Sequence, residues 1–250
     1  MILSTRRAVA VARRVLRQLG RDHRFLALSL AVPVLVIYLT HVFFDAFASP
    51  AFEPAPVAVP LGAFIVHFLT YILCALVLVR ERGAGTLQRM FVSGYRRAEI
   101  IAGYVLAYTC LATVQSLLVL SELSWLFHPG YGIDQLLSMY LVIWLLAVIS
   151  ISLGILVSNF ARTEGQVFPF IPAVILPSVL LSGVILPVAR LPQWAQVLGR
   201  AIPLYWANRL IEGLVKPGGE LTGDWVALVG LPLYGLAILL LATRTLRELD

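Results

Sequence analysis

The chain of 250 residues is 60% hydrophobic and only 13% charged, with a mean hydropathy of +0.91 and a net charge of +6. A soluble domain of this size has an apolar share of about 45–50%. The composition therefore excludes an ordinary soluble enzyme or binding domain and indicates an integral membrane protein.

The first 24 residues predict an amphipathic connecting helix. On a helical wheel the apolar residues gather on one side and the arginines on another. The apolar set is Ala8, Val9, Ala12, Val15, Leu16 and Leu19, and the basic set is Arg6, Arg7, Arg13, Arg14, Arg17 and Arg21. We expect this helix to lie at the membrane interface and to turn at Gly20 into the first span. It serves either as a positively charged anchor alone or as a docking element for a cytoplasmic partner.

Six segments are long and apolar enough, at about 20 residues, to cross a membrane as helices. They cover residues 25–44, 57–79, 100–120, 136–157, 167–186 and 226–242. An open sheet would leave backbone groups unpaired in lipid. The sequence therefore predicts an all-α membrane protein with two regions, the connecting helix 1–24 and a six-span transmembrane domain 25–250.

The first span ends at Ala46-Phe47-Ala48, which resembles a signal-peptidase site. A signal peptide has an apolar core of about 7–15 residues. Because the apolar run here is longer, we expect the first span to remain uncleaved.

Basic residues are unevenly distributed between the two ends of the expected bundle. With the N-terminus inside, the inner segments hold 15 of the 19 basic residues. The outer ones are Arg190, Arg200, Arg209 and Lys216. Lys and Arg near span ends stay on the cytoplasmic side. We therefore expect a multi-pass protein of the cell inner (plasma) membrane with both termini in the cytoplasm, and we expect no nucleic-acid partner.

The segment RERGAGTLQRMFVSGYRRAEI, residues 80–100, carries five arginines between two apolar runs. Gly83 and Gly85 are expected to end the preceding helix, and Gly94 to end a short amphipathic one. Its apolar residues are Leu87, Met90, Phe91 and Tyr95, and its polar ones are Gln88, Arg89, Ser93 and Arg96. An apolar edge of two turns binds lipid weakly. The pattern therefore favours a protein partner over a helix that rests on lipid headgroups.

The fifth apolar segment is the least regular of the six. Its internal prolines are Pro169, Pro172 and Pro177. Each removes a backbone hydrogen bond and tends to kink a helix, which is tolerated where the segment lines a pathway or re-enters the membrane. Ordinary prolines in a membrane helix are the alternative. Residues 191–215 are too polar to span but rich in aromatic residues, so we expect re-entrant helices in the outer leaflet before the last span.

Few polar side chains fall inside the expected spans. His41 and His67 are candidates for a functional group or for a hydrogen bond between helices. Cys74 and Cys110 are expected to be small packing residues rather than a disulfide or metal site. A stripe of aromatic and polar residues on the second span could contact a solute or pack against a neighbouring helix. With the prolines of the fifth segment, the candidate pathway residues are Phe64, His67, Phe68, Tyr71, Pro172 and Pro177.

Three motifs occur in order around these spans: RERGAGTL (80–87) after the second, SNFARTE (158–164) before the fifth and AIPLYWANRL (201–210) before the last. This order resembles the type-2 membrane (permease) subunits of ABC transporters, exporters with the ABCG-like (type V) membrane fold. The first motif is similar to the family's "RE…GTL" signature and the last to its "NP…Y…R" segment. The family often has an acidic residue after GTL, where this chain has Gln88.

The resemblance implies that the helix after the signature is a coupling helix that inserts into a separate cytoplasmic ABC ATPase subunit. The coupling residues would be Gly85, Thr86, Leu87, Gln88, Arg89, Met90, Phe91 and Gly94. We expect Leu87, Met90 and Phe91 to form an exposed apolar knob, with Arg89 as a charge beside it. The resemblance also implies export of a hydrophobic or amphipathic solute (a drug, lipid or lipid-like natural product). Two copies, or one copy and a homologous subunit, would form the pathway.

A phosphate-binding loop needs a Lys followed by Ser or Thr, whereas the single lysine, Lys216, precedes Pro217. We therefore expect no enzyme activity and no cofactor on this chain, with ATP and Mg bound by the ATPase. The alternative is a secondary transporter or channel with no ATPase partner. Such transporters usually have inverted repeats with helix breaks in both halves, whereas the breaks here concentrate in one span. An intramembrane enzyme would need a nucleophile and a base on facing spans, and the sequence contains no G-x-S-G or H-E-x-x-H pattern.

Overall fold

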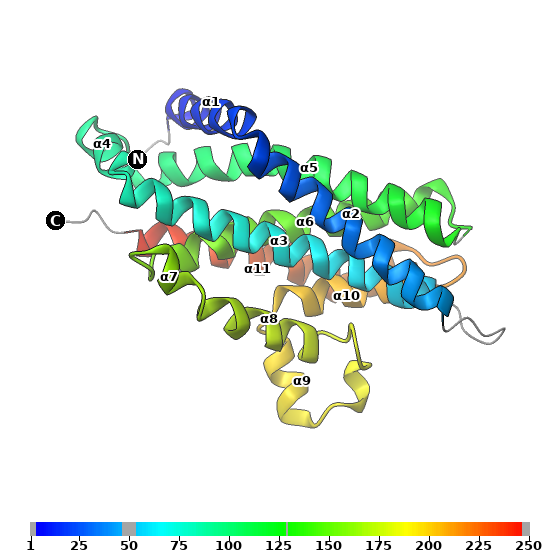
Figure 1. Cartoon of the computed structure of the whole chain (residues 1–250). Helices are drawn as coiled ribbons and strands as arrows, with labels where there is room; N and C mark the ends of the chain where they lie inside the picture. Colours follow the sequence, from blue (N-terminus) through cyan, green and yellow to red (C-terminus); the bar gives the residue numbers. More distant parts are fainter. Residues whose placement is uncertain (1–3, 47–53, 129, 247–250) are drawn as a thin grey trace.

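The computed structural model describes residues 4–46, 54–128 and 130–246, and every regular element in these ranges is a helix (Figure 1). Six helical segments among them are long and apolar enough to cross a membrane. They are α2 (His23–Ala46), α3 (Ala55–Gly83), α5 (Arg97–Phe127), α6 (Ile133–Ser158), α7 (Glu164–Val167) with α8 (Phe170–Leu181), and α11 (Trp225–Thr245). The predicted all-α class and the six spans are confirmed.

The remaining elements are short or lie at the ends of the bundle. They are α1 (Thr5–Arg21), α4 (Thr86–Val92), α9 (Gln193–Gly199), α10 (Pro203–Leu214) and the 3-10 turns Val188–Arg190 and Leu221–Asp224. The cleavage motif at Phe47 and Ala48 lies outside the described residues.

Helices α3 and α6 form the centre of the bundle, and α5 and α11 also pack against α6. Small residues permit these contacts. A Cβ atom on Gly154 of α6 would lie 2.6 Å from the carbonyl oxygen of Tyr71 on α3, and one on Gly235 of α11 would lie 2.6 Å from Ile149 on α6. Helices in lipid associate largely through such close packing, because the hydrophobic effect does not drive helices together there. The glycines therefore set the spacing of the core.

Helices α2 and α8 form the least covered parts of the bundle. Only 17% of the apolar window of α2 and 11% of that of α7 and α8 is buried within the chain. An apolar surface of this kind faces lipid or another subunit. Cys74 on α3 is buried, as expected, whereas Cys110 on α5 is exposed, so the prediction of a packing role is wrong for Cys110.

Helix α1, helix α4, the turn at 158–164 and the last turn of α11 share one end of the bundle (Figure 1). Asn159 donates hydrogen bonds of 3.0 Å both to the carbonyl oxygen of Ala242 and to Thr245 Oγ1, which joins the end of α6 to the end of α11. We call this the arginine-rich end. The described parts of both terminal regions lie there, as an even number of spans requires. That this end faces the cytoplasm stays a prediction.

The fifth apolar segment is broken as its prolines predict. Helix α7 ends at Val167 and α8 begins at Phe170. The helix ends at Leu181, five residues before the predicted end of the span, because the chain bends there and passes through Gly183 in the left-handed region (φ +95°). A side chain at Gly183 would be strained in this conformation.

Helices α9 and α10 are the short helices expected before the last span. Helix α10 lies beside the first half of α11, where a Cβ atom on Gly230 would lie 2.8 Å from the ring of Trp206. Tyr234, near the middle of α11, donates a hydrogen bond of 2.8 Å to the carbonyl oxygen of Ala201. The two helices are confirmed as elements, and their insertion into the outer leaflet stays a prediction.

The buried side of α1 differs from the predicted one. Val11 is buried with Ala8, Ala12, Val15 and Leu19, whereas Val9 and Leu16 are exposed. The reason is that α1 packs on α5, where a Cβ atom on Gly103 would lie only 2.5 Å from Val11 Cβ. The turn into α2 falls at Asp22, two residues after the expected Gly20.

Candidate functional site

Helix α4 is held in a fixed direction by the glycines at its two ends. Gly85 (φ +67°) and Gly94 (φ +79°) both adopt the left-handed conformation that favours glycine. The backbone N–H of Tyr95 donates to the carbonyl oxygen of Met90 at 3.1 Å and that of Gly94 to Phe91 at 2.8 Å, which closes the C-terminal end of the helix. The predicted short helix between glycines is confirmed.

The charged residues just before α4 each reach a different element. Arg80 donates to both carboxylate oxygens of Glu164 on α7, at 2.8 and 3.1 Å. Arg82 donates to the carbonyl oxygens of Ser158 and, at 2.8 Å, Ala161, in the turn between α6 and α7. The segment that precedes α4, residues 80–82, which we call the root of α4, is therefore joined to the 158–164 turn. The two motifs that stand far apart in the sequence form one structure.

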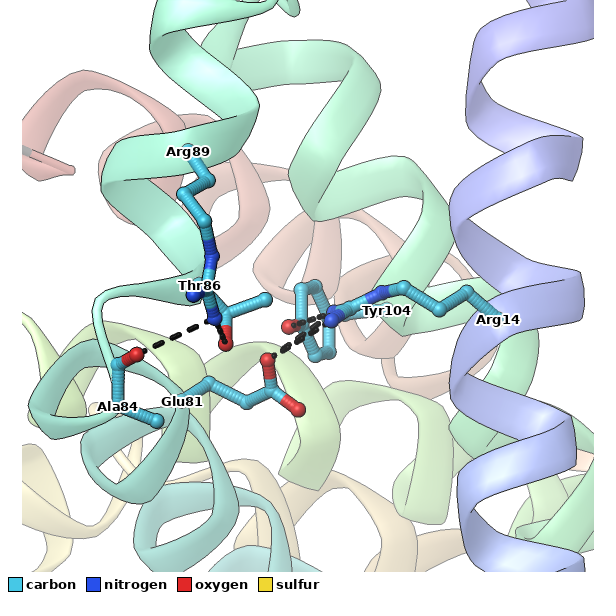
Figure 2. A network of polar contacts seen from close by, with 6 residues as sticks. All are labelled: Arg14, Glu81, Ala84, Thr86, Arg89 and Tyr104. Carbon is cyan, nitrogen blue, oxygen red and sulfur yellow. Dashed lines mark hydrogen bonds and ion pairs between the residues drawn. The ribbon is translucent and has the colours of Figure 1, made fainter.

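Glu81 joins the same root to α1 and α5 (Figure 2). Both Nη atoms of Arg14 donate to Glu81 Oε2 at 3.1 Å, and Arg14 Nη2 also donates to the Tyr104 hydroxyl at 2.7 Å. Burial lowers the pKa of the Arg14 guanidinium, but Tyr104 and Glu81 outweigh burial and raise that pKa overall. Because Glu81 is only 4% exposed, its carboxylate depends on this partner.

The C-terminal end of α4 is held by the first turn of α1. Arg7 donates a hydrogen bond of 2.5 Å to the carbonyl oxygen of Gly94, and its guanidinium lies 5.6 Å from the centre of the Tyr95 ring. Glu99 on α5 accepts from the backbone N–H groups of Arg96, at 3.0 Å, and Ser4, at 3.1 Å. Helix α4 is thus fastened at both ends to α1.

The exposed side of α4 is not the predicted one. Leu87 and Met90 are 3% and 8% exposed, and Phe91 is partly buried against the same core. The expectation that Leu87 and Met90 belong to an exposed knob is therefore wrong, because this apolar face packs against the chain's own hydrophobic core. Val92, which we did not single out from the sequence, is 91% exposed.

The surface that α4 offers to solvent, which we call the α4 tip, consists of Gln88, Arg89, Val92 and Ser93. Gly85 and Thr86 are partly buried beside it. The guanidinium of Arg89 folds back to the carbonyl oxygen of Ala84 and to Thr86 Oγ1, at 3.3 Å each (Figure 2). The tip is therefore one apolar side chain surrounded by polar groups. Residues 88 and 92 stand one helical turn apart and therefore lie on the same face of α4. This spacing is the sequence signal that could have placed Val92 on the exposed face.

The polar residues of the predicted pathway lie inside the chain. His67 is fully buried, and its Nδ1 lies 2.7 Å from Ser150 Oγ on α6. Because the Ser150 hydroxyl donates to Leu146, it accepts from His67, which makes this an α3–α6 hydrogen bond. Tyr71, also buried, donates to the carbonyl oxygen of Phe170 on α8 at 3.2 Å. Both residues connect helices within one chain.

The other candidate pathway residues are more accessible. Phe64 and Phe68 stack on each other with ring centres 6.0 Å apart and are partly buried. Pro172 is exposed and Pro177 partly buried on α8. The stripe on α3 therefore divides into two buried polar residues and two half-covered aromatic ones. A role of Phe64, Phe68, Pro172 and Pro177 in a pathway stays a prediction.

The AIPLYWANRL motif forms a second polar cluster on α10. Arg209 makes an ion pair with Asp224 at the start of α11, with nitrogen to oxygen distances of 2.7 and 2.9 Å. Its guanidinium also lies 5.8 Å from the Tyr205 ring centre and 6.0 Å from that of Trp206. This arginine fixes α10 against α11.

The sequence profile of the family described as "ABC-2 type transporter" matches residues 6–214, from α1 to the end of α10. The chain belongs to the ABC-2 type transporter family. The matched range of this ABC-2 type protein includes α4 and the residues that hold it, and α11 lies beyond the range.

Curated relatives support the same assignment. The ABC-2 type chain is 32% identical over 169 residues to the "Probable multidrug ABC transporter permease YbhR" of Escherichia coli (strain K12), covering 67% of this chain and 45% of that protein. It is 26% identical over 188 residues to the "Linearmycin resistance permease protein LnrN" of Bacillus subtilis (strain 168), covering 74% and 48%. It is 26% identical over 175 residues to the "ABC transporter G family member 20" of Dictyostelium discoideum, covering 69% and 24%. The chain spans about half the length of the two bacterial relatives.

Proposed function

We propose that this chain is the membrane subunit of an ATP-driven exporter and that a separate ATPase subunit contacts it through the α4 tip. The solute would be hydrophobic or amphipathic. The names of two bacterial relatives, which mention multidrug transport and linearmycin resistance, support this class. No observation on the described residues favours the alternative of a secondary transporter or channel.

The observation that carries the proposal is that polar contacts hold the residues before α4 to three other parts of the chain. Ion pairs and hydrogen bonds from Arg80, Glu81 and Arg82 fix its root to α7, to α1 and to the turn after α6. A helix that merely rests on lipid has no need of such anchors. A displacement of the α4 tip by a bound partner would instead be transmitted to α1 and to the α6–α7 turn.

The pathway would form between two membrane subunits, either two copies or one copy and a homologue. The uncovered apolar faces of α2 and α8 support this arrangement, because they leave room for a second subunit. The concentration of arginines at the end that carries α4 supports a cytoplasmic location for that end.

The test is to co-express the chain with candidate ATPase subunits and to measure co-purification and solute-stimulated ATP hydrolysis. Val92→Glu places a charge at the centre of the α4 tip and should abolish both without loss of membrane insertion. The matched control is Ile133→Glu, the same kind of change at an exposed residue at the opposite end of α6. Normal ATPase association in Val92→Glu would contradict the proposal.

A further inference from the structure

A cavity of about 240 Å³ lies where α1 turns into α2, at the arginine-rich end. It is lined by residues of α1, α2, α3, α4 and α5, beside the Arg14 and Glu81 pair seen in Figure 2. Its position at the first turn of α2 places it level with the headgroups of the adjoining leaflet, if α2 spans the membrane. Small-molecule sites usually have volumes of about 300–1,000 Å³. The cavity is therefore better suited to a headgroup than to a whole drug-sized solute.

Two residues that line the cavity, Tyr108 and Arg14, each carry a buried hydrogen-bond donor without a partner among the described residues. The Tyr108 side chain is 1% exposed, and its hydroxyl has no hydrogen-bond partner among the described residues. The same is true of Arg14 Nε, although both Nη atoms of Arg14 are bonded. Leaving a buried donor unpaired costs about 1–3 kcal/mol. Two such donors on residues that line one cavity favour a ligand with an acceptor group.

The charged residues of the wall cancel each other. Arg14 and Arg80 are basic, and Asp22 and Glu81 are acidic. Glu81 is already paired with Arg14, whereas Asp22 lies at the exposed mouth and uses one oxygen to accept from the backbone N–H of Phe25 at 3.0 Å. A ligand of no net charge, with an anionic group inside and a cationic group at the mouth, matches this distribution.

The uncharged part of the wall contains the polar residues Gln18 and Thr86 and a group of apolar residues. The apolar group includes Val15, Leu19, Phe25 and Val77. Beyond Phe25 along α2, the apolar side chains of Leu28 and Leu35 are exposed. Acyl chains could follow this surface from the cavity.

We propose that the cavity binds the headgroup of a zwitterionic phospholipid of the ethanolamine type. Its phosphate accepts hydrogen bonds from the Tyr108 hydroxyl and Arg14 Nε, and its ammonium group donates to Asp22. The glycerol and first methylene groups lie along the apolar wall. The bound lipid ties α1 to α2 and α5 as a structural ligand. This inference requires a membrane but neither an ATPase nor export, so it can fail while the proposed function holds.

The test uses the full chain in nanodiscs that contain equal amounts of phosphatidylethanolamine, phosphatidylcholine and phosphatidylglycerol. Native mass spectrometry then identifies the lipid retained after release into detergent. We expect phosphatidylethanolamine to be enriched several-fold over the other two. Tyr108→Phe should reduce its retention roughly tenfold, because the removed donor bonds a charged group. The fold should not suffer, because that hydroxyl has no hydrogen-bond partner in the part of the chain that the structure describes. Tyr38→Phe on the exposed surface of α2 is the matched control.

Asp22→Asn provides an independent test of the charge argument. Asparagine caps a helix as well as aspartate, so the start of α2 should remain intact. The wall gains one net positive charge, and retention should shift from phosphatidylethanolamine toward phosphatidylglycerol. Equal retention of the three lipids by the unaltered chain, or a lipid profile unchanged in both variants, would overturn the proposal. Displacement of the lipid by millimolar glycerophosphoethanolamine would point to a soluble ligand and would also overturn it.

Discussion

Arg14 and Glu81, 67 positions apart in the sequence, form a part-buried ion pair with 3.1 Å between each Nη atom of Arg14 and Glu81 Oε2. The pair connects the N-terminal helix to the residue that stands five positions before the first residue of α4. Tyr104 on α5 accepts from the same guanidinium at 2.7 Å. The position of α4 therefore depends on α1 as well as on the helix that precedes it.

This pair predicts a stability effect that a double-mutant cycle can measure. Arg14→Met leaves the buried Glu81 carboxylate without its partner and should destabilise the chain by about 1–3 kcal/mol, less than a fully buried pair because Arg14 is partly exposed. Adding Glu81→Leu should restore much of the loss. Thermal unfolding in detergent of both single variants and the double variant checks this. Strictly additive losses would show that the two residues are not coupled.

Substitutions on the buried face of α4 should lower the stability of the chain, whereas substitutions on its exposed face should weaken association with the ATPase. Leu87→Ala and Met90→Ala remove buried contacts and should each destabilise the chain by about 2–4 kcal/mol. Val92→Ala removes an exposed side chain and should leave the unfolding temperature unchanged. It should weaken ATPase association by about 1–2 kcal/mol if Val92 is an interface anchor.

Unfolding temperature and ATPase co-purification, measured on the same preparations, check this prediction. Phe91→Ala should affect both quantities, since Phe91 is partly buried. A Val92→Ala variant that unfolds earlier yet binds the ATPase normally would reverse the assignment of the two faces.

The spans could be predicted from the sequence because length and hydropathy alone determine whether a segment can cross a membrane. The same holds for the helix ends at the glycines around α4, because glycine readily adopts the left-handed conformation seen at Gly85 and Gly94. The direction of an apolar face could not be predicted in this way. Periodicity placed Leu87 and Met90 on one side of α4, but it does not say whether that side meets the chain's own core or a partner.

The partners of the charged residues could not be predicted from the sequence either. Glu164 pairs with Arg80 across 84 positions, and Arg14 pairs with Glu81 across 67. Such pairs follow from how the helices pack, which depends on contacts such as that of Gly103 with Val11. A helical wheel of α1 that assumes a flat lipid surface therefore placed Val9 and Leu16 on the buried side.

The distribution of charge predicts the orientation of the chain. In a variant whose Cys74 and Cys110 are replaced by alanine, Arg89→Cys and Arg162→Cys should react in intact cells only with membrane-permeant thiol reagents. His128→Cys, at the exposed end of α5, should react with impermeant reagents. Each position lies outside the six candidate membrane spans, so labelling reports the side of the membrane directly. Labelling of position 89 from outside would reverse the orientation.

The division of the α3 stripe predicts different effects for its two kinds of residue. His67→Leu removes one buried hydrogen bond to Ser150, and such bonds between membrane helices contribute about 0.6 kcal/mol on average. Ser150 keeps its bond to Leu146, so no new unpaired donor arises. We expect a small loss of stability and no change in which solutes stimulate ATP hydrolysis. Phe68→Ala, on the half-covered part of the stripe, should change that solute profile if the pathway runs beside α3.

Profiles of solute-stimulated ATP hydrolysis, measured for both variants with the co-purified ATPase, separate the two roles. The comparison is internal, because both residues lie on α3 within one helical turn of each other and face different surroundings. A changed profile in His67→Leu would mean that this residue becomes accessible during transport. An unchanged profile in Phe68→Ala, with basal hydrolysis intact, would assign the whole stripe to packing.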